Sequence, residues 1–267
     1  MLEFALSGLR SGLRGRSFHA VFLLGVLLIG VAHLSGFFSP RQPQTVALDV
    51  GFSGIRFSLI LMNLFWVQEL VAREIDRRVI LFSLAYPVSR AAFLAGRFAA
   101  IIILSALAAT VLGLLLVLAV LLIGGGYAQE FPPALGLPFW STVAGFALDA
   151  AVVAAFSLCV AALSTVSVLP LALGAAFAVA CKALGATVDY LARGADGDRD
   201  LVASYQPLID AIRWVLPDLS RLDWREWAMY QLAPGIEAAF WSVTMAVAYI
   251  VLLLVAASLL FSRREFS

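Results

Sequence analysis

Three charged residues interrupt long apolar stretches of this sequence. Arg56, Asp149 and Lys182 each lie in a stretch that is otherwise apolar enough to cross a lipid bilayer. A charge in the hydrocarbon core is costly, so it is usually paired with another charge or used in transport. At 1.5 Å per residue, Arg56 is ~9 Å from the outer end of its predicted span, and the other two are ~14 Å from theirs. The three side chains are therefore predicted to share a layer in the outer half of the membrane.

Two interpretations of this charge layer stay open. In the first, Asp149 pairs with Lys182 or with Arg56 and fixes how the spans pack. In the second, the cations face an anionic group of a transported substrate. Exchange of Asp149 for Asn tests both, because each predicts a loss of assembly or of transport.

Motifs for enzymatic chemistry are missing from the sequence. The only histidines, His19 and His33, share one apolar stretch, and no Gly-x-Ser-x-Gly nucleophile turn occurs. Cys159 and Cys181 lie inside apolar stretches and have neither metal-ligand spacing nor a disulfide framework around them. The chain is therefore expected not to be an enzyme and to hold no cofactor or metal of its own.

The elements that position the three charges follow from composition. Of 267 residues, 63% are hydrophobic and 13% are charged, whereas soluble domains have ~25% charged residues. The mean hydropathy of +0.99 is too high for one soluble core to bury. The net charge of +1 gives no basic field for nucleic acid. The chain is predicted to be an integral membrane protein with a single domain over residues 1–267.

The fold class is predicted to be an all-α polytopic membrane protein with six transmembrane helices. A bilayer core of ~30 Å needs about 20 apolar residues per helix, and transmembrane β-strands would show shorter, alternating patterns. The predicted spans are Phe18–Phe38, Val50–Ala72, Ala99–Ile123, Trp140–Ser164, Val168–Leu191 and Gly235–Phe261.

The arginines indicate the orientation of these spans. An even number of spans puts both termini on one side, and the arginines concentrate in the N-terminal segment, the loop after the second span and the C-terminal tail. Short loops rich in Arg stay on the cytoplasmic side. Both termini are therefore expected to be cytoplasmic. The residues concerned are Arg10, Arg14, Arg16, Arg73, Arg77, Arg78, Arg90, Arg97, Arg263 and Arg264.

Two segments outside the spans are predicted to be amphipathic. Residues 1–16 place Leu2, Leu6, Leu9 and Leu13 on one helical face, which suits an interfacial elbow helix on membrane lipid. Residues 192–234 form the last extracytoplasmic loop and are expected to contain short amphipathic helices, with Trp224 and Trp227 resting on the outer headgroups.

The cytoplasmic loop over residues 73–90 carries the strongest functional signal. It opens with Arg73-Glu74-Ile75-Asp76-Arg77-Arg78, continues through a short helical pattern with an apolar face, and ends at Pro87-Val88-Ser89-Arg90. Gly96-Arg97-Phe98 then leads into the third span. So short a helix is unstable alone in water and needs a surface to dock on.

In this order and topological position, the loop resembles that of type 2 ABC exporter permeases, the membrane subunits of ATP-binding-cassette transporters. The resemblance covers the whole chain. It implies a coupling helix that docks into a separate cytoplasmic ATPase, with two ATPase copies and a second permease, most simply a homodimer. It also implies a bacterial inner membrane. The implied coupling residues are Glu74, Arg77, Arg78, Ile80, Leu84, Pro87, Ser89 and Arg90.

ATP and magnesium would then be bound by the partner ATPase. The chain itself has no Gly-x4-Gly-Lys-Ser/Thr phosphate loop. The rival interpretations are an ion-gradient-driven transporter or channel that uses Arg56, Asp149 and Lys182, and a membrane anchoring or assembly subunit. The substrate does not follow from the sequence.

Overall fold

The computed structural model describes residues 2–76, 90–123, 132–192, 205, 207 and 216–263, and every regular element within them is helical. The first four elements are close in sequence: the N-terminal helix, two long helices and a π-helical turn. They are α1 (Leu2–Arg14), α2 (Arg16–Phe37), α3 (Pro43–Val67) and the turn η1 (Gln68–Ala72). The others are α4 (Arg73–Asp76), α6 (Arg90–Leu122), α7 (Leu137–Leu163), α8 (Leu169–Ala192), η3 (Leu219–Leu222), α10 (Arg225–Tyr230) and α11 (Ile236–Arg263).

Five of the described helices are long and apolar enough to cross a membrane. They are α2, α3 with η1, α6, α7 and α11. The predicted span Val168–Leu191 corresponds to α8, but its described apolar part, Leu169–Gly185, falls short of a full span by length. Beyond Gly185, α8 turns more polar, with Thr187, Asp189 and Tyr190 in sequence. The all-helical, multi-span character predicted from the sequence is thus found, with five clear spans.

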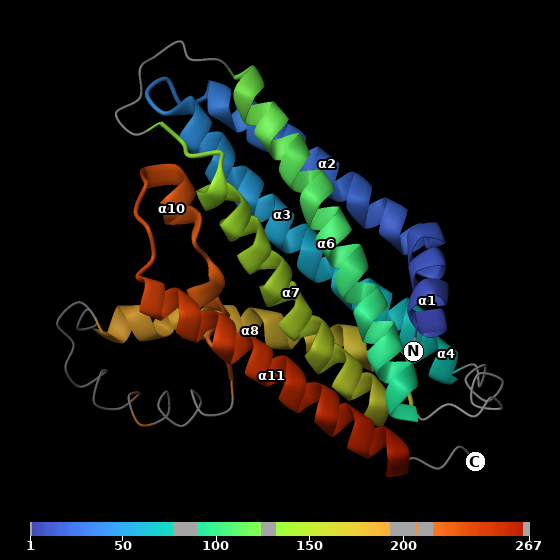
Figure 1. Ribbon diagram of the computed structural model, residues 1–267. Helices are drawn as coiled ribbons and strands as arrows, with labels where there is room; N and C mark the ends of the chain where they lie inside the picture. Colours follow the sequence, from blue (N-terminus) through green and yellow to red (C-terminus); the bar gives the residue numbers. More distant parts are fainter. Residues whose placement is uncertain are drawn as a thin grey trace.

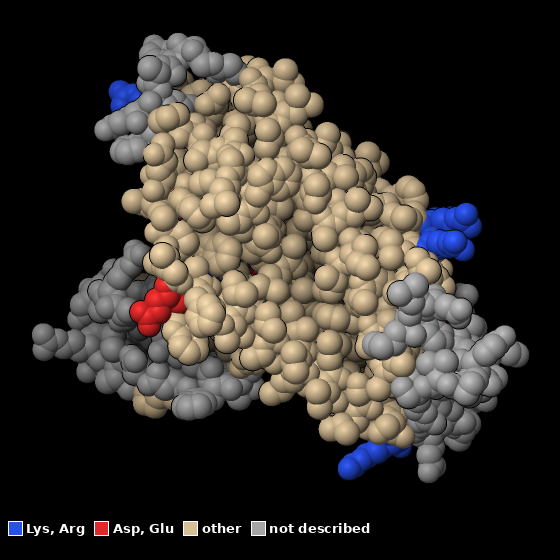
Figure 2. Space-filling model, viewed as in Figure 1, with Lys and Arg blue, Asp and Glu red and all other residues tan. Residues whose placement is uncertain are grey.

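The bundle is centred on α3. In Figure 1, α2, α3, α6 and α7 run side by side, and both chain termini lie at the end of the bundle that also holds α1 and α4. We call this the α4 end, and the opposite end, beside α10, the α10 end. Figure 2 shows that Lys and Arg on this face lie at the edges of the molecule, including beside α1, and leave an uncharged surface between them.

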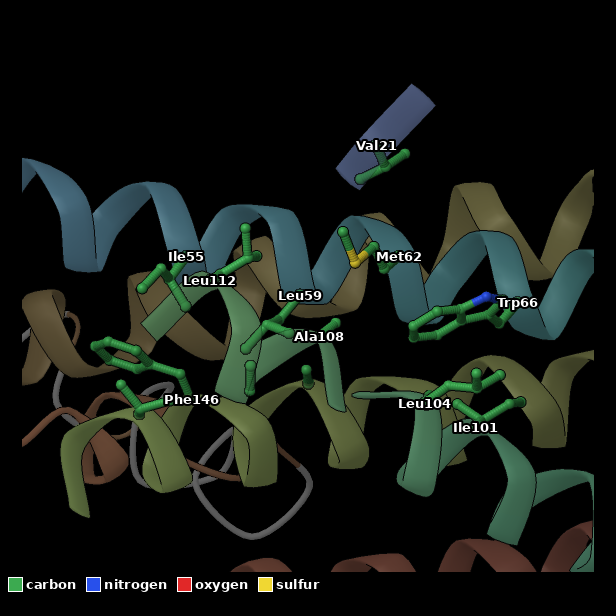
Figure 3. Close-up of a cluster of buried hydrophobic side chains, with 14 of the residues drawn as sticks. Val21, Ile55, Leu59, Met62, Trp66, Ile101, Leu104, Ala108, Leu112 and Phe146 are labelled. Atoms are coloured by element: carbon green, nitrogen blue, oxygen red, sulfur yellow. The ribbon is translucent and has the colours of Figure 1, made fainter. Parts of the chain in front are cut away.

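The core of the bundle forms along one face of α3. Ile55, Leu59, Met62 and Trp66 recur at helical spacing and are almost completely buried. In Figure 3, Ile55 and Leu59 point toward α6 and α7, Met62 points toward Val21 of α2, and Trp66 lies beside Leu104 of α6. Leu112 and Phe146 close the core from α6 and α7. This periodicity is the apolar stripe that a helix needs in order to pack against neighbours.

The helix α3 begins earlier than the predicted start at Val50. Pro43 occupies its first turn, where the fixed backbone angle of proline favours helix and its missing N–H costs nothing. At 1.5 Å per residue, Arg56 is therefore ~20 Å from the start of α3 rather than ~9 Å. The charge expected in the outer half of the span lies near the middle of the helix.

The N-terminal helix α1 packs on the bundle through glycines. Gly8, Gly12 and Gly15 are buried, and a Cβ atom at Gly8 or Gly12 would collide with Ala100 or Leu104 of α6. Small residues let two helices approach closely. The leucine face that the sequence assigned to lipid is partly outward, with Leu6 49% exposed and Leu13 37% exposed.

Residues 216–235, the described stretch before α11, pack against the bundle. The Trp224 carbonyl accepts a hydrogen bond from Thr142 Oγ1 (3.0 Å), and the Ala228 carbonyl accepts one from the Ala134 amide (2.8 Å). Both are contacts to α7 or to the residues just before it. This region therefore caps α7 and α3 while leaving Trp224 and Trp227 half-buried, and the headgroup role of these two residues stays a prediction.

Candidate functional site

Arg56 is the centre of a buried charge cluster. Its Nε donates to Asp149 Oδ2 at 2.6 Å, its Nη1 to Asp223 Oδ2 at 2.9 Å and its Nη2 to the Leu219 carbonyl at 3.1 Å. The side chain of Arg56 is 3% exposed and that of Asp149 is 2% exposed. The guanidinium thus ties together α3, α7 and the segment that carries η3.

The cluster continues through a second arginine toward the α10 end. Arg225 Nε donates to Asp223 Oδ1 at 2.9 Å, and its Nη1 donates to Asp49 Oδ1 at 2.6 Å and to Ser53 Oγ at 3.1 Å. Burial lowers the pKa of Arg225, but its hydrogen bonds to Asp223 and Asp49 outweigh burial and raise it. Asp223 therefore bridges two arginines that remain charged.

An aromatic ring completes this arrangement. The guanidinium carbons of Arg56 and Arg225 lie 5.5 Å and 5.9 Å from the centroid of the Phe146 ring. Both distances are within the range of cation–π attraction. Phe146 is itself completely buried, so the ring holds both cations over α7 without admitting water.

The structure decides which partner Asp149 takes. The sequence left Arg56 and Lys182 open, and Asp149 contacts Arg56. Lys182 is on an exposed face of α8 and makes no ion pair with the described residues, although it lines a groove that also contains Arg56. The three predicted charges are therefore neighbours, but only two of them are paired.

Sequence reasoning missed Asp49, Asp223 and Arg225. Asp223 and Arg225 are in the loop that was expected to lie outside the membrane, and Asp49 precedes the predicted start of its span. Buried charges need a counter-charge, and Asp223 and Arg225 provide one for Arg56 and for each other once their loop is placed against the bundle. The sequence does not show that this loop packs against the bundle, so the need for a counter-charge could not be predicted from it.

A second charged contact lies at the α4 end. Arg97 Nη2 donates to Glu74 Oε1 at 2.6 Å, and Arg97 Nη1 donates to Ser7 Oγ at 3.2 Å. Burial raises the pKa of Glu74 above its ordinary value of 4.5, and the neighbouring Arg97 only partly offsets this rise. The contact joins α4, α6 and α1 at the two borders of the predicted coupling loop.

Most predicted coupling residues cannot be placed. Glu74 is in α4 as described above, and Arg90 is the first residue of α6. The remaining predicted coupling residues fall outside the described part of the chain: Arg77, Arg78, Ile80, Leu84, Pro87 and Ser89.

The chemistry open to the Arg56 cluster is electrostatic. Its three carboxylates, Asp49, Asp149 and Asp223, each contact an arginine. Among the described residues, no three His, Cys, Asp or Glu side chains come together to hold a metal ion. The arrangement can fix the position of the 216–225 segment in the bundle, and it presents Lys182 as a further cation beside it.

Comparison with known proteins does not assign this chain to a family. No family model matches the chain, and no curated protein matches its sequence. The function is therefore argued from the residues and their arrangement.

Proposed function

We propose that this chain is the transmembrane permease subunit of an ATP-binding-cassette exporter. In this role it forms the substrate pathway and couples it to a separate cytoplasmic ATPase. The loop after α4 would dock on two ATPase copies across a permease dimer, most simply a homodimer in a bacterial inner membrane with both termini cytoplasmic. ATP and magnesium would be bound by the ATPase.

The observation that carries this proposal is the contact between the two borders of the loop. The ion pair of 2.6 Å between Glu74 and Arg97 connects the end of α4 to the first turns of α6. Arg97 is 6% exposed and also reaches α1 through Ser7. A displacement of the intervening loop by an ATPase would therefore be passed to α3, α6 and α1 together, which is what coupling requires.

The experiment is purification of the tagged protein from its host in mild detergent, with identification of co-eluting proteins and an ATPase assay. A stoichiometric ATPase is expected, and Leu84→Asp should remove it because a charge on the apolar docking face is costly. Arg77→Glu should uncouple hydrolysis from the permease, whereas the charge-conserving Arg77→Lys should not. A folded Leu84→Asp variant that keeps a full complement of ATPase would refute the docking role.

A second candidate is a transporter driven by an ion gradient. It is favoured by the buried pair Arg56–Asp149, since charges in the middle of spans often mark ion pathways. This candidate predicts that transport in proteoliposomes collapses when the proton or sodium gradient is dissipated, with ATP unable to restore it. An exporter would instead need ATP and its ATPase, and its transport would continue after the ion gradient is dissipated.

A further inference from the structure

An apolar groove with a single uncommitted cation runs between α3 and α8. Its volume is about 220 Å³. It is lined by one stripe of α3, which runs from Ser53 to Leu64, and by one stripe of α8, which runs from Ala175 to Lys182. At 1.5 Å per residue, the α3 wall is ~16 Å long.

The two ends of the groove differ in polarity. Ser53, Arg56 and Lys182 lie at the end nearer α10, while Leu64 and Ala175 lie toward α4. The rims are apolar side chains on the surface of the bundle, with Phe57 54% exposed and Val179 69% exposed. An occupant must therefore be polar at one end and hydrocarbon along the rest of its length.

The charge of the occupant follows from the cations at the polar end. Each nitrogen of Arg56 already donates to an oxygen of Asp149, Asp223 or Leu219, so its charge is already compensated by two carboxylates. Lys182 has no ion-pair partner within the described residues and is an exposed residue of α8 that lines the groove. An anion on the occupant would provide the counter-charge that a cation at this depth needs.

The volume of the groove limits the occupant to a single acyl chain. Pockets that enclose a drug-sized ligand are ~300–1,000 Å³, and this groove is smaller. A second copy of the protein would be a less suitable occupant, because it would have to bring an unpaired carboxylate to Lys182. In the described residues at this depth, Asp49, Asp149 and Asp223 already contact arginines and offer no carboxylate to Lys182.

We propose that the groove binds a single-chain anionic lipid of the fatty-acid class, with its carboxylate on Lys182 and its acyl chain against α3 and α8. Lys182 lines the same groove as Arg56, which lies near the middle of α3, where a resident bilayer lipid does not place its headgroup. The bound lipid is therefore a cargo in passage. This inference rests on the proposed transport function and names its class of substrate.

The test is photolabelling of the purified full chain in phosphatidylcholine nanodiscs, with no ATPase and no nucleotide present. The probe is palmitic acid with a diazirine on its chain, and the neutral control is palmityl alcohol with the same diazirine. Labelled peptides are mapped by mass spectrometry. The acid should label α3 and α8 near the groove, and an excess of unlabelled palmitic acid should suppress this labelling.

Four variants separate the charge from the shape of the groove. Lys182→Gln should weaken binding about tenfold, the usual value of a charged hydrogen bond, and Lys182→Arg should restore it. Ala175→Phe should fill the groove and abolish labelling. The matched control Ala176→Phe should leave labelling intact, because Ala176 is equally exposed on α8 but does not line the groove.

Several results would overturn the inference. These are equal labelling by acid and alcohol, unchanged labelling of a folded Lys182→Gln variant, or equal effects of Ala175→Phe and Ala176→Phe. Cross-linking of two copies through this groove would overturn it as well. Since binding is measured without the ATPase, absence of an ATPase partner would refute the proposed function while leaving lipid binding to stand or fall separately.

Discussion

At the scale of single residues, the pairing of Arg56 with Asp149 controls the centre of the molecule. Both side chains are buried, with 3% and 2% of their surface exposed. A buried ion pair adds little stability compared with well-packed apolar residues, but removal of one partner leaves an uncompensated charge. Removal of one partner is therefore expected to lower the free energy of unfolding much more than the intact pair raises it.

Exchange of Asp149 for Asn should destabilise the protein by about 3 kcal/mol, because Arg56 keeps its charge and loses its shortest ion pair. The measurement is the thermal midpoint of the purified protein in detergent. The control is Arg221→Gln, which removes an arginine side chain that is 58% exposed, and it should change stability by less than about 1 kcal/mol. Equal midpoints for wild type and Asp149→Asn would contradict the assignment.

The sequence predicted part of this cluster for a sound physical reason. Charges in apolar stretches stand out, so Arg56 and Asp149 were identified and Asp149 was expected to pair. The choice between Arg56 and Lys182 depended on helix rotation, which spacing alone does not give. Asp223 escaped notice because its loop is polar enough to be read as lying outside the membrane.

At the scale of helices, the docking of α1 depends on small residues. Gly12 is buried against Leu104 and Trp66, and the indole Nε1 of Trp66 donates to the Gly12 carbonyl at 3.4 Å. No side chain fits in this contact. The neighbouring Ser11 is exposed and provides a matched site on the same turn.

Replacement of Gly12 by Leu should therefore release α1 from α6 at a cost of about 2 kcal/mol, typical of overpacking. Ser11→Leu should leave α1 docked. Limited proteolysis of the N-terminal segment in detergent distinguishes them, with faster cleavage expected only for Gly12→Leu. If both variants are cleaved at the wild-type rate, the glycine contact does not hold α1.

The contact between α4 and α6 should depend on pH. The raised pKa of Glu74 means that the folded protein binds this proton more tightly than the unfolded chain. Its contribution to stability is thus complete below the ordinary value of 4.5 and is lost as pH rises through the raised pKa. The thermal midpoint of wild type minus that of Glu74→Gln should fall over this range. A difference that rises with pH would mean that Arg97 dominates.

The positions of the helices were easier to predict than the sides of each helix that contact other helices. Long uncharged stretches located α2, α6, α7 and α11 to within a few residues at most ends, because apolar length alone defines a span. The starts of α3 and α6 were predicted too late, since Pro43 and Arg90 are polar-loop residues by composition yet open these helices. For α1, leucine periodicity predicted the lipid side, but the glycines that make the protein contact carry no hydropathy signal.

At the scale of the whole molecule, α8 decides the path of the chain. Its described apolar part is short for a span, yet its two ends meet opposite parts of the bundle. The turn before it, at Thr165, borders Ala72 at the α4 end. Farther along, Gly185 packs against Ser220 beside the Arg56 cluster, and residues 216–231 run along α7 to Gln231, whose Nε2 donates to the Pro132 carbonyl at 3.2 Å.

The non-helical backbone of residues 216–231 is compatible with membrane depth because other parts of the protein form hydrogen bonds with it. Non-helical backbone at membrane depth survives only when its polar groups are satisfied within the protein. The Leu219 and Trp224 carbonyls accept hydrogen bonds from Arg56 and Thr142, and Asp218 caps η3 through the Ser220 amide at 3.1 Å. We therefore predict that α8 and residues 216–231 together complete one crossing of the membrane.

Single cysteines introduced into a background with Cys159 and Cys181 replaced by Ala test this crossing. Thr165→Cys should react with a membrane-impermeant maleimide from the same side as Arg73→Cys, and Gln231→Cys should react from the side of Arg41→Cys. All four positions are exposed, so a difference in labelling reports sidedness and not burial. If Thr165→Cys and Gln231→Cys reacted from one side, the predicted crossing between these two positions would be refuted.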